Sequence, residues 1–145
     1  MMSIKKEAVV LALLALAPCV SMAQSVSGKN ESPVACRAFG GVSGQVCPTS
    51  FISLIARPEI FSGRTIAVQG WPKQLHGTFY LFFDKGAADN NLVENALLCR
   101  SGCDRLKSRV GIRTTLIGGF TTDVPRTDLF TPVGAIKVKL IREID

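Results

Sequence analysis

Five basic side chains gathered between residues 100 and 113 are the strongest chemical signal in the sequence, and Asp104 is the one acidic residue among them. A cluster of one sign attracts phosphate, sulfate or carboxylate groups, so this segment predicts a surface that binds an anion. A solvated basic loop without a ligand has the same composition and stays open as the alternative. The candidate binding residues are Arg100, Arg105, Lys107, Arg109 and Arg113.

Aromatic side chains on two expected strands offer a second kind of surface, since exposed rings stack on nucleic-acid bases. Successive residues of a strand face opposite ways, so we expect most of these rings to fill the core instead. Export from the cytoplasm, for which the evidence follows, also argues against a nucleic-acid partner. The rings belong to Trp71, Phe79, Tyr80 and Phe82.

Groups for catalysis are sparse. His76 is the single histidine, in an expected loop beside Gly77, and the sequence has no G-x-S-x-G motif. We therefore expect a non-enzymatic binding module whose partner is a protein or an anionic ligand. The alternative is a small secreted hydrolase that uses His76 or carboxylates in loops and at strand ends, namely Asp84, Asp89, Glu94, Asp123 and Asp128.

The cysteines indicate disulfides rather than a metal site. With Cys19 in a removable leader, four remain, and an even number in an exported chain predicts two bridges. Three pairings are possible. We favour Cys36 with Cys47 and Cys99 with Cys103, and the main alternative ties the amino-terminal segment to the strand that carries Cys99. A C-x₂-C pair is absent and histidine occurs once, so the spacing predicts neither zinc nor any other cofactor.

The amino terminus predicts an export signal. Lys5 and Lys6 precede an apolar run over residues 8–17, which is too short to span a bilayer. Small residues follow, and we expect cleavage between Ala23 and Gln24, which delivers a periplasmic or secreted protein. A lipoprotein is the alternative, with Cys19 as the modified residue, but proline stands immediately before that cysteine where a small residue is needed.

Composition fits one globular domain. Apolar residue types make up 47% of the 145 residues and charged types 19%, which excludes collagen-like, coiled-coil and low-complexity chains. The formal net charge is +6. Loss of Lys5, Lys6 and Glu7 with the leader would lower it to +5, still compatible with an anionic partner.

The periodicity of the mature chain changes from helical to alternating. After a signal peptide over 1–23, we expect a flexible, disulfide-pinned arm over 24–47 and a barrel domain over 48–145. A helix begins after Ser50 and ends before Pro58, and residues 59–63 form a turn. A polar loop begins at residue 84. Strands are expected over 66–72, 78–83, 96–99, 110–122 and 136–140.

These elements predict a mainly β fold: a five-stranded, OB-like Greek-key barrel preceded by a short N-terminal helix. The long fourth strand contains Gly118-Gly119, which indicates a bulge or a sharp bend.

Two stretches resemble small exported bacterial OB-fold proteins of an uncharacterised family. One is residues 52–71, with a helix, a Pro-Glu turn, a Gly-Arg step and a strand that reaches glycine. The other is residues 77–85, followed by a loop and Asn95-Ala-Leu-Leu. The resemblance covers about residues 52–119. It implies a fold and no catalytic residues, because function belongs to sites rather than to folds.

Overall fold

The computed structural model describes residues 34–125 and 131–143, which belong to one compact unit, Pro33–Asp145. The expected signal peptide, its cleavage site, Cys19 and residues 24–33 lie outside the described residues, as does Asp128. Along the described chain the elements are β1 (Arg37–Phe39), β2 (Val42–Pro48), α1 (Phe51–Ala56), α2 (Pro58–Phe61), β3 (Thr65–Leu75), β4 (Thr78–Phe82), α3 (Lys85–Asp89), η1 (Val93–Asn95), β5 (Ala96–Ser101), η2 (Asp104–Arg109), β6 (Thr114–Thr121) and β7 (Gly134–Glu143).

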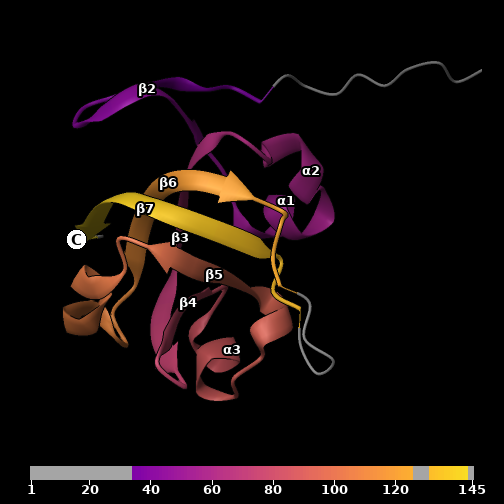
Figure 1. Ribbon diagram of the computed structural model, residues 1–145, viewed down its shortest axis with the longest axis vertical. Coiled ribbons are helices and arrows are strands. Elements are labelled where there is room, and N and C mark those ends of the chain that lie inside the picture. The colour runs from indigo at the N-terminus through magenta and orange to yellow at the C-terminus, as the bar shows by residue number, and fades with distance from the viewer. Residues whose placement is uncertain (1–33, 126–130, 144–145) are drawn as a thin grey trace, which may run out of the picture. The chain divides into compact units, whose positions relative to one another are not determined.

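The strands form one mixed sheet (Figure 1). Its order is β1-β2-β3-β4-β5-β7-β6, and a further pairing of β3 with β6 makes a closed cycle of β3, β4, β5, β7 and β6. The pairs β2–β3 and β5–β7 are parallel and the others antiparallel. The mainly β prediction is confirmed. The prediction of a five-stranded OB-like Greek-key barrel is corrected to a seven-stranded mixed sheet, since two strands precede the cycle.

Those two strands replace the irregular arm expected before Pro48. β1 and β2 pair as an antiparallel hairpin through Gly40-Gly41, and Gly41 has a φ of +88° that favours glycine. β2 then leads into a short parallel pairing with β3, in which Cys47 lies opposite Ile66 and Pro48 opposite Ala67. The hairpin is thereby joined to the closed cycle at the edge of β3.

β3 is the longest strand because it pairs with two other strands in succession. Its first half, Thr65–Gly70, pairs with β6, and its second half, from Trp71 to Leu75, pairs with β4. The strand was expected to end near Pro72, but it continues to a two-residue turn at His76-Gly77. Both turn residues have positive φ, 48° and 81°, as a tight hairpin turn requires.

The short helices cover the ends of the cycle. The predicted cap of α1 is confirmed: the Ser50 side chain accepts a hydrogen bond from the backbone N–H of Ser53 at 3.1 Å. The turn expected over 59–63 is instead α2, with Pro58 in its first turn. The polar loop expected from residue 84 contains α3, because the Asp84 carboxylate accepts a hydrogen bond from the N–H of Ala87 at 2.7 Å.

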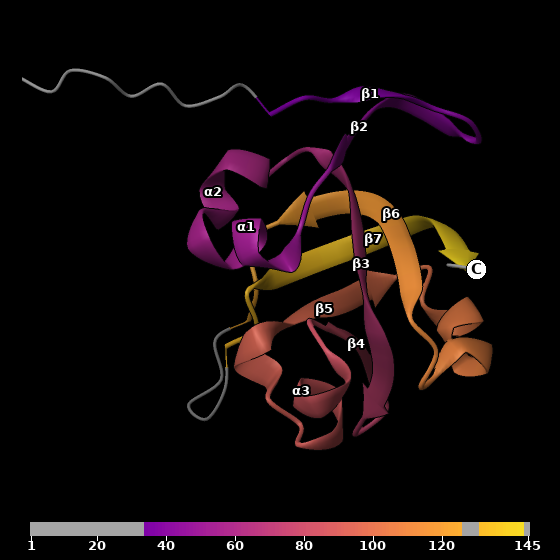
Figure 2. The ribbon, with the colours of Figure 1, turned by 180° about the vertical axis from the view of Figure 1, so that it is seen from behind.

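One apolar core fills the closed cycle. Ile66, Val68 and Leu116 are fully buried there, together with residues from the other strands. Phe51, Leu54 and Phe61 enter the same cluster from α1 and α2, and Leu106 enters it from η2. Figures 1 and 2 show α1 and α2 on one side of the strands and η2 on the other, so the helices close opposite ends of the core.

Both favoured disulfides are confirmed, Cys36–Cys47 and Cys99–Cys103. Two bridges indicate an oxidising compartment, because cytosolic thiols are kept reduced. Within the described ranges, no helix has the length and apolar character needed to cross a bilayer.

The expected long strand over 110–122 is shorter than its sequence pattern. β6 begins at Thr114, and Val110 and Ile112 lie in a turn before it, 49% and 47% exposed. The predicted bulge is confirmed, because the register between β6 and β7 shifts between Ile117 and Gly118.

The bulge makes a prediction that separates two adjacent glycines. A Cβ at Gly118 would collide with the carbonyl oxygen of Lys137, whereas a Cβ at Gly119 meets nothing within 4 Å. We expect Gly118→Ala to lower the free energy of unfolding by about 2 kcal/mol or more, because backbone must move to admit the methyl group. Gly119→Ala is the matched control and should change it by less than about 1 kcal/mol. Urea unfolding measures both, and equal losses would contradict this account of the bulge.

Candidate functional site

A groove of about 700 Å³ lies between the β1–β2 hairpin and the outer face of the closed cycle. Figure 2 is seen from the side on which β3 and β6 lie in front, with the hairpin above them. The volume is in the range of small-ligand sites. The groove is lined by Arg37, Phe39, Pro48, Thr49, Ser50, Phe51, Ala67, Gln69, Phe83, Arg113, Thr115 and Arg142.

Strand register builds the floor of the groove. Gln69 of β3 lies opposite Thr115 of β6, and Thr115 lies opposite Arg142 of β7. These three residues form one row across three strands. Their neighbours in sequence, such as Val68 and Leu116, point into the core, so alternation sends this row outward.

Every charged residue that lines this groove is an arginine, and we call it the arginine groove. Arg37 comes from β1, Arg113 from the residue before β6 and Arg142 from β7, and all three are exposed. Among the described residues, no Asp or Glu lines the groove. Guanidinium groups present planar, paired donors that match carboxylate, sulfate and phosphate oxygens, so the groove is suited to an anion.

Arg142 also fastens the hairpin to the end of β7. Its guanidinium carbon lies 4.4 Å above the centre of the Phe39 ring, and its Nη2 donates a hydrogen bond of 3.2 Å to the carbonyl oxygen of Gly40. A cation over an aromatic face is attracted by the ring quadrupole. The side chain that lines the groove therefore also fixes one wall of it.

The groove has an aromatic part as well as a charged part. Phe51 and Phe83 pack edge to face with ring centres 6.2 Å apart, and Phe39 adds a half-buried ring on the hairpin side. Phe83 is 43% exposed although it is large and apolar. A ligand with an apolar or planar portion would cover this exposed ring, which removes apolar surface from water.

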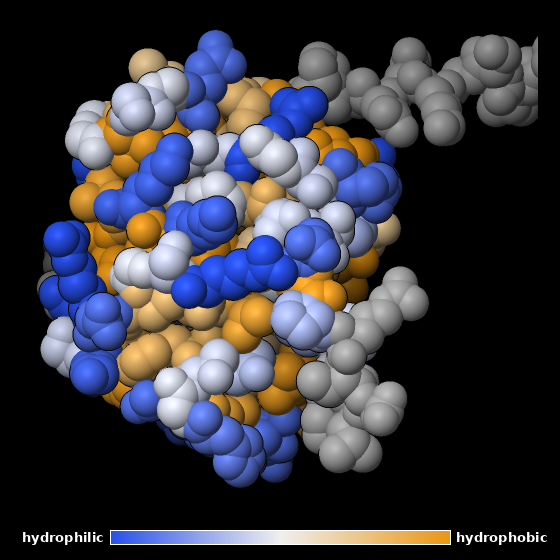
Figure 3. Space-filling view, viewed as in Figure 1, coloured by the Kyte–Doolittle hydropathy of each residue, from blue (hydrophilic) through white to orange (hydrophobic). Residues whose placement is uncertain are grey.

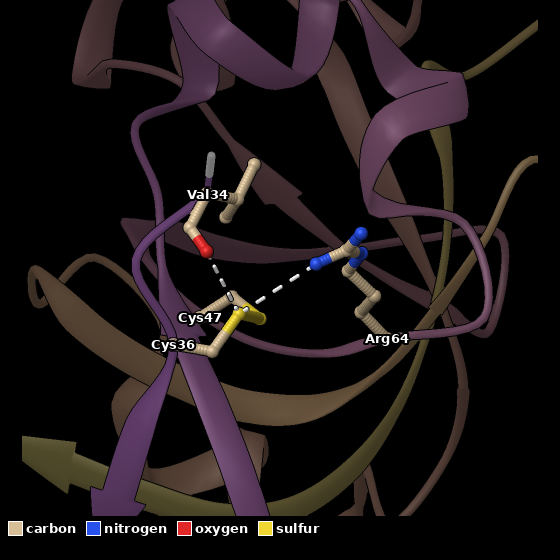
Figure 4. The surroundings of a disulfide bond; sticks show 4 residues. All are labelled: Val34, Cys36, Cys47 and Arg64. Atoms are coloured by element: carbon tan, nitrogen blue, oxygen red, sulfur yellow. Dashed lines mark hydrogen bonds between the residues drawn. A yellow bond between two sulfur atoms is a disulfide. The ribbon is translucent and has the colours of Figure 1, made fainter. Parts of the chain in front are cut away.

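A disulfide holds the first strand of the hairpin next to β2. Figure 4 shows Cys36 bonded to Cys47, with the side chain of Arg64 directed at the sulfur of Cys36. The distance from Arg64 Nη1 to this sulfur is 3.8 Å. Cys36 immediately precedes β1 and Cys47 pairs with β3, so the bridge connects the wall that carries Arg37 to the closed cycle.

The predicted basic segment does not form a single patch. Arg100 extends to the loop after β6, where it donates a hydrogen bond to the Asp123 carbonyl oxygen and lies 3.7 Å from the Asp123 carboxylate. Arg100 and Lys107 line a second cavity of about 350 Å³, and Arg105 lines a third of about 120 Å³. Arg109 lies at the end of η2. Only Arg113 of the five reaches the arginine groove.

The groups considered for hydrolysis lie apart. His76 is exposed at the tip of the turn between β3 and β4. Asp84 caps α3, Asp89 pairs with Lys85 at 2.7 Å, and Asp123 is engaged by Arg100. Glu94 lies in η1. The described residues contain no group of three or more His, Cys, Asp or Glu side chains placed to hold a metal ion.

Two of the four aromatic side chains considered for stacking are buried, and two are half-buried. Phe79 and Phe82 are buried, at 6% and 0% exposure. Trp71 and Tyr80 are half-buried against the small cluster that α3 forms with β4. These four rings do not form a stacking platform on the surface. The exposed aromatic surface of the groove comes instead from Phe39 and Phe83, which sequence reasoning did not single out.

Sequence reasoning also missed Arg37 and Arg142, which lie 105 positions apart. Arg37 is an isolated basic residue in its stretch of sequence, and Arg142 follows Lys137 and Lys139 on a strand whose alternation alone does not single it out. The signal that was available is the Gly40-Gly41 pair, since two glycines between short runs are typical of a hairpin turn. A hairpin predicted at these glycines would have indicated that residues 37–39 form one wall of a groove.

Comparison with known proteins assigns no family. No protein-family profile matches the chain, and no curated protein matches it significantly in sequence. A DUF3299 family protein from Pseudomonas aeruginosa PAO1 aligns with a TM-score of 0.46 and 12% identity over 59% of this chain and 64% of that one. This chain therefore spans less than two thirds of that protein.

A second solved structure, assigned as an aspartyl-tRNA synthetase from Leishmania major, aligns with a TM-score of 0.40 and 13% identity. The alignment covers 83% of this chain and 22% of that one. Both TM-scores are below 0.5, so neither likeness says anything about the function of this chain.

The contact between Arg142 and Phe39 makes a testable prediction about the groove wall. In a double-mutant cycle of Arg142→Ala and Phe39→Ala, we expect a coupling free energy of about 0.5–1 kcal/mol, because a cation–π pair at a partly exposed site is worth that much. Urea unfolding of the four proteins measures it. A second cycle, with Phe83→Ala in place of Phe39→Ala, is the control and should show coupling near zero. Equal coupling in both cycles would contradict the assignment.

Proposed function

We propose that this chain is an exported, non-enzymatic binding module that holds an anionic ligand in the arginine groove. The observation that carries the proposal is that one cavity of the described residues combines three arginines with exposed aromatic surface and is lined by no carboxylate. The two disulfides support export, because they persist in oxidising compartments. The closed cycle of β3, β4, β5, β7 and β6 supports an OB-like scaffold, extended here by the hairpin.

The ligand follows from the chemistry of the lining. Arg37 and Arg113 supply guanidinium donors from opposite walls, and Gln69 and Thr115 add neutral hydrogen-bonding groups on the floor. Phe83 offers an exposed ring at the same cavity. A small molecule with a phosphate, sulfate or carboxylate group beside an aromatic or apolar portion would use both parts. Charge-assisted hydrogen bonds contribute about 1.5–3 kcal/mol each, so loss of two arginines is expected to dominate affinity.

The roles of the carboxylates favour binding over hydrolysis. Asp84 and Asp89 already cap or pair within α3, and Asp123 is engaged by Arg100. His76 is exposed at the turn between β3 and β4. The groove itself contains hydroxyl groups but no histidine or carboxylate that would act as a general base. A hydrolase would need groups that the groove does not contain.

A pair of aryl probes tests this proposal. We expect 1-naphthyl phosphate to bind in the groove and neutral 1-naphthol to bind at least tenfold more weakly, because only the phosphate engages the guanidinium groups. The variant Arg37→Gln/Arg113→Gln should weaken binding of 1-naphthyl phosphate by at least tenfold, as the loss of two charge-assisted contacts predicts. Isothermal titration calorimetry in 0.1 M salt measures these affinities.

Non-specific attraction to a basic protein is tested by a matched control. Lys137→Gln/Lys139→Gln removes the same charge from exposed positions of β7 that do not line the groove. This variant should keep at least half of the wild-type affinity. Equal weakening by both double variants, or equal binding of the phosphate and the alcohol, would show that the arginine groove is not the site.

A further inference from the structure

We propose that the turn between η2 and β6 is a membrane-surface anchor that inserts Val110 and Ile112 into a bilayer containing anionic phospholipid. Both side chains are large, aliphatic and about half exposed, at 49% and 47%. They stand on either side of Gly111, at the loop that Figure 1 shows beside η2 and before β6. This surface is separate from the floor of the arginine groove, and the inference does not depend on the proposed ligand.

The turn has the geometry that presents two side chains rigidly. Val110 has φ −57° and ψ 127°, Gly111 has φ +79°, and the N–H of Ile112 donates to the carbonyl oxygen of Arg109 at 3.0 Å. These values define a type II turn, in which glycine is favoured at the third position. The aliphatic side chains are therefore held at a tip of defined shape.

Contacts on both sides keep this tip from folding back over the core. The N–H of Gly111 donates to the carbonyl oxygen of Pro72 at 3.3 Å, and the Thr114 hydroxyl donates to the carbonyl oxygen of Ile112 at 2.8 Å. On the other side, Leu106 is fully buried and anchors η2, and the Cys99–Cys103 bridge precedes it. The exposure of Val110 and Ile112 is thus built into the loop, although covering them would be favourable in water.

Cationic residues flank the aliphatic pair along the chain. Arg105, Lys107 and Arg109 precede it in η2 and Arg113 follows it, whereas Asp104 is the one acidic residue from 104 to 113. Along the edge of the molecule that carries η2, Figure 3 shows strongly hydrophilic side chains beside apolar surface. A bilayer with anionic headgroups offers both complements, since its acyl region takes short aliphatic side chains and its phosphates take lysine and arginine.

The charge of the neighbouring sequence distinguishes this pair from the exposed apolar pair of α1. Ile52 and Ile55 of α1 are 65% and 43% exposed, but the stretch from Pro48 to Ala56 contains no charged residue. Val110 and Ile112 line none of the three cavities described above. An exposed, positively flanked aliphatic pair fits a lipid surface better than it fits a partner that must itself enter a pocket.

Vesicle co-sedimentation tests the anchor. The protein is purified from the periplasm of a bacterial host. Mass spectrometry identifies its N-terminal residue, which is the same in all variants. We expect binding to vesicles of equal parts phosphatidylglycerol and phosphatidylcholine, and at least tenfold weaker binding to phosphatidylcholine alone. Val110→Ser/Ile112→Ser should weaken binding to the anionic vesicles by roughly tenfold or more. Because both side chains are exposed, the urea midpoint of this variant should stay close to that of the wild type.

Two further variants decide whether the tip itself is responsible. Ile52→Ser/Ile55→Ser removes an equally apolar pair from α1 and should bind anionic vesicles as the wild type does. Arg105→Gln/Lys107→Gln should weaken binding severalfold without changing affinity for phosphatidylcholine. Failure of the wild type to bind anionic vesicles would overturn the proposal. Equal weakening of vesicle binding by the two serine double variants would also overturn it. The same holds if the tip binds an acidic protein surface and does not bind lipid.

Discussion

The attachment of the β1–β2 hairpin to β3 is the constraint on which the proposed site depends. The parallel pairing covers only Cys47 with Ile66 and Pro48 with Ala67. Two other contacts reinforce it, the Cys36–Cys47 bridge on one side and the contact of Arg142 with Phe39 and Gly40 on the other. Without this attachment Arg37 and Phe39 would leave the groove, and the outer face of β3 and β6 would be an open sheet surface.

The same attachment explains why charge in the sequence and charge in the structure gather in different places. A cluster along the chain disperses when its backbone turns at η2, so Arg100 reaches Asp123 while Arg113 lines the groove. Residues far apart then converge because antiparallel register places Arg142 beside Thr115. The basic segment contributes one residue to the groove, and Arg105, Lys107 and Arg109 lie in η2, which precedes the aliphatic turn.

Local signals were sufficient for much of the fold. The cap at Ser50, the stop before Pro58 and the bulge at Gly118 follow from residue types whose backbone preferences are strong. The observed disulfides are the favoured one of the three pairings that the sequence left open. The strand over 110–122 was predicted too long, because alternation of Val110 and Ile112 looks the same whether the side chains are buried or held out by a turn. The groove could not be predicted, since Arg37 and Arg142 meet only through tertiary packing.

The most direct test of the central claim is to map where an aryl anion binds. In a titration of the ¹⁵N-labelled protein with 1-naphthyl phosphate, backbone amide shifts should concentrate at residues 37–39, 67–69, 113–115 and 142, which enclose the groove. Shifts confined to residues 100–109, or spread evenly over all basic residues, would contradict the account.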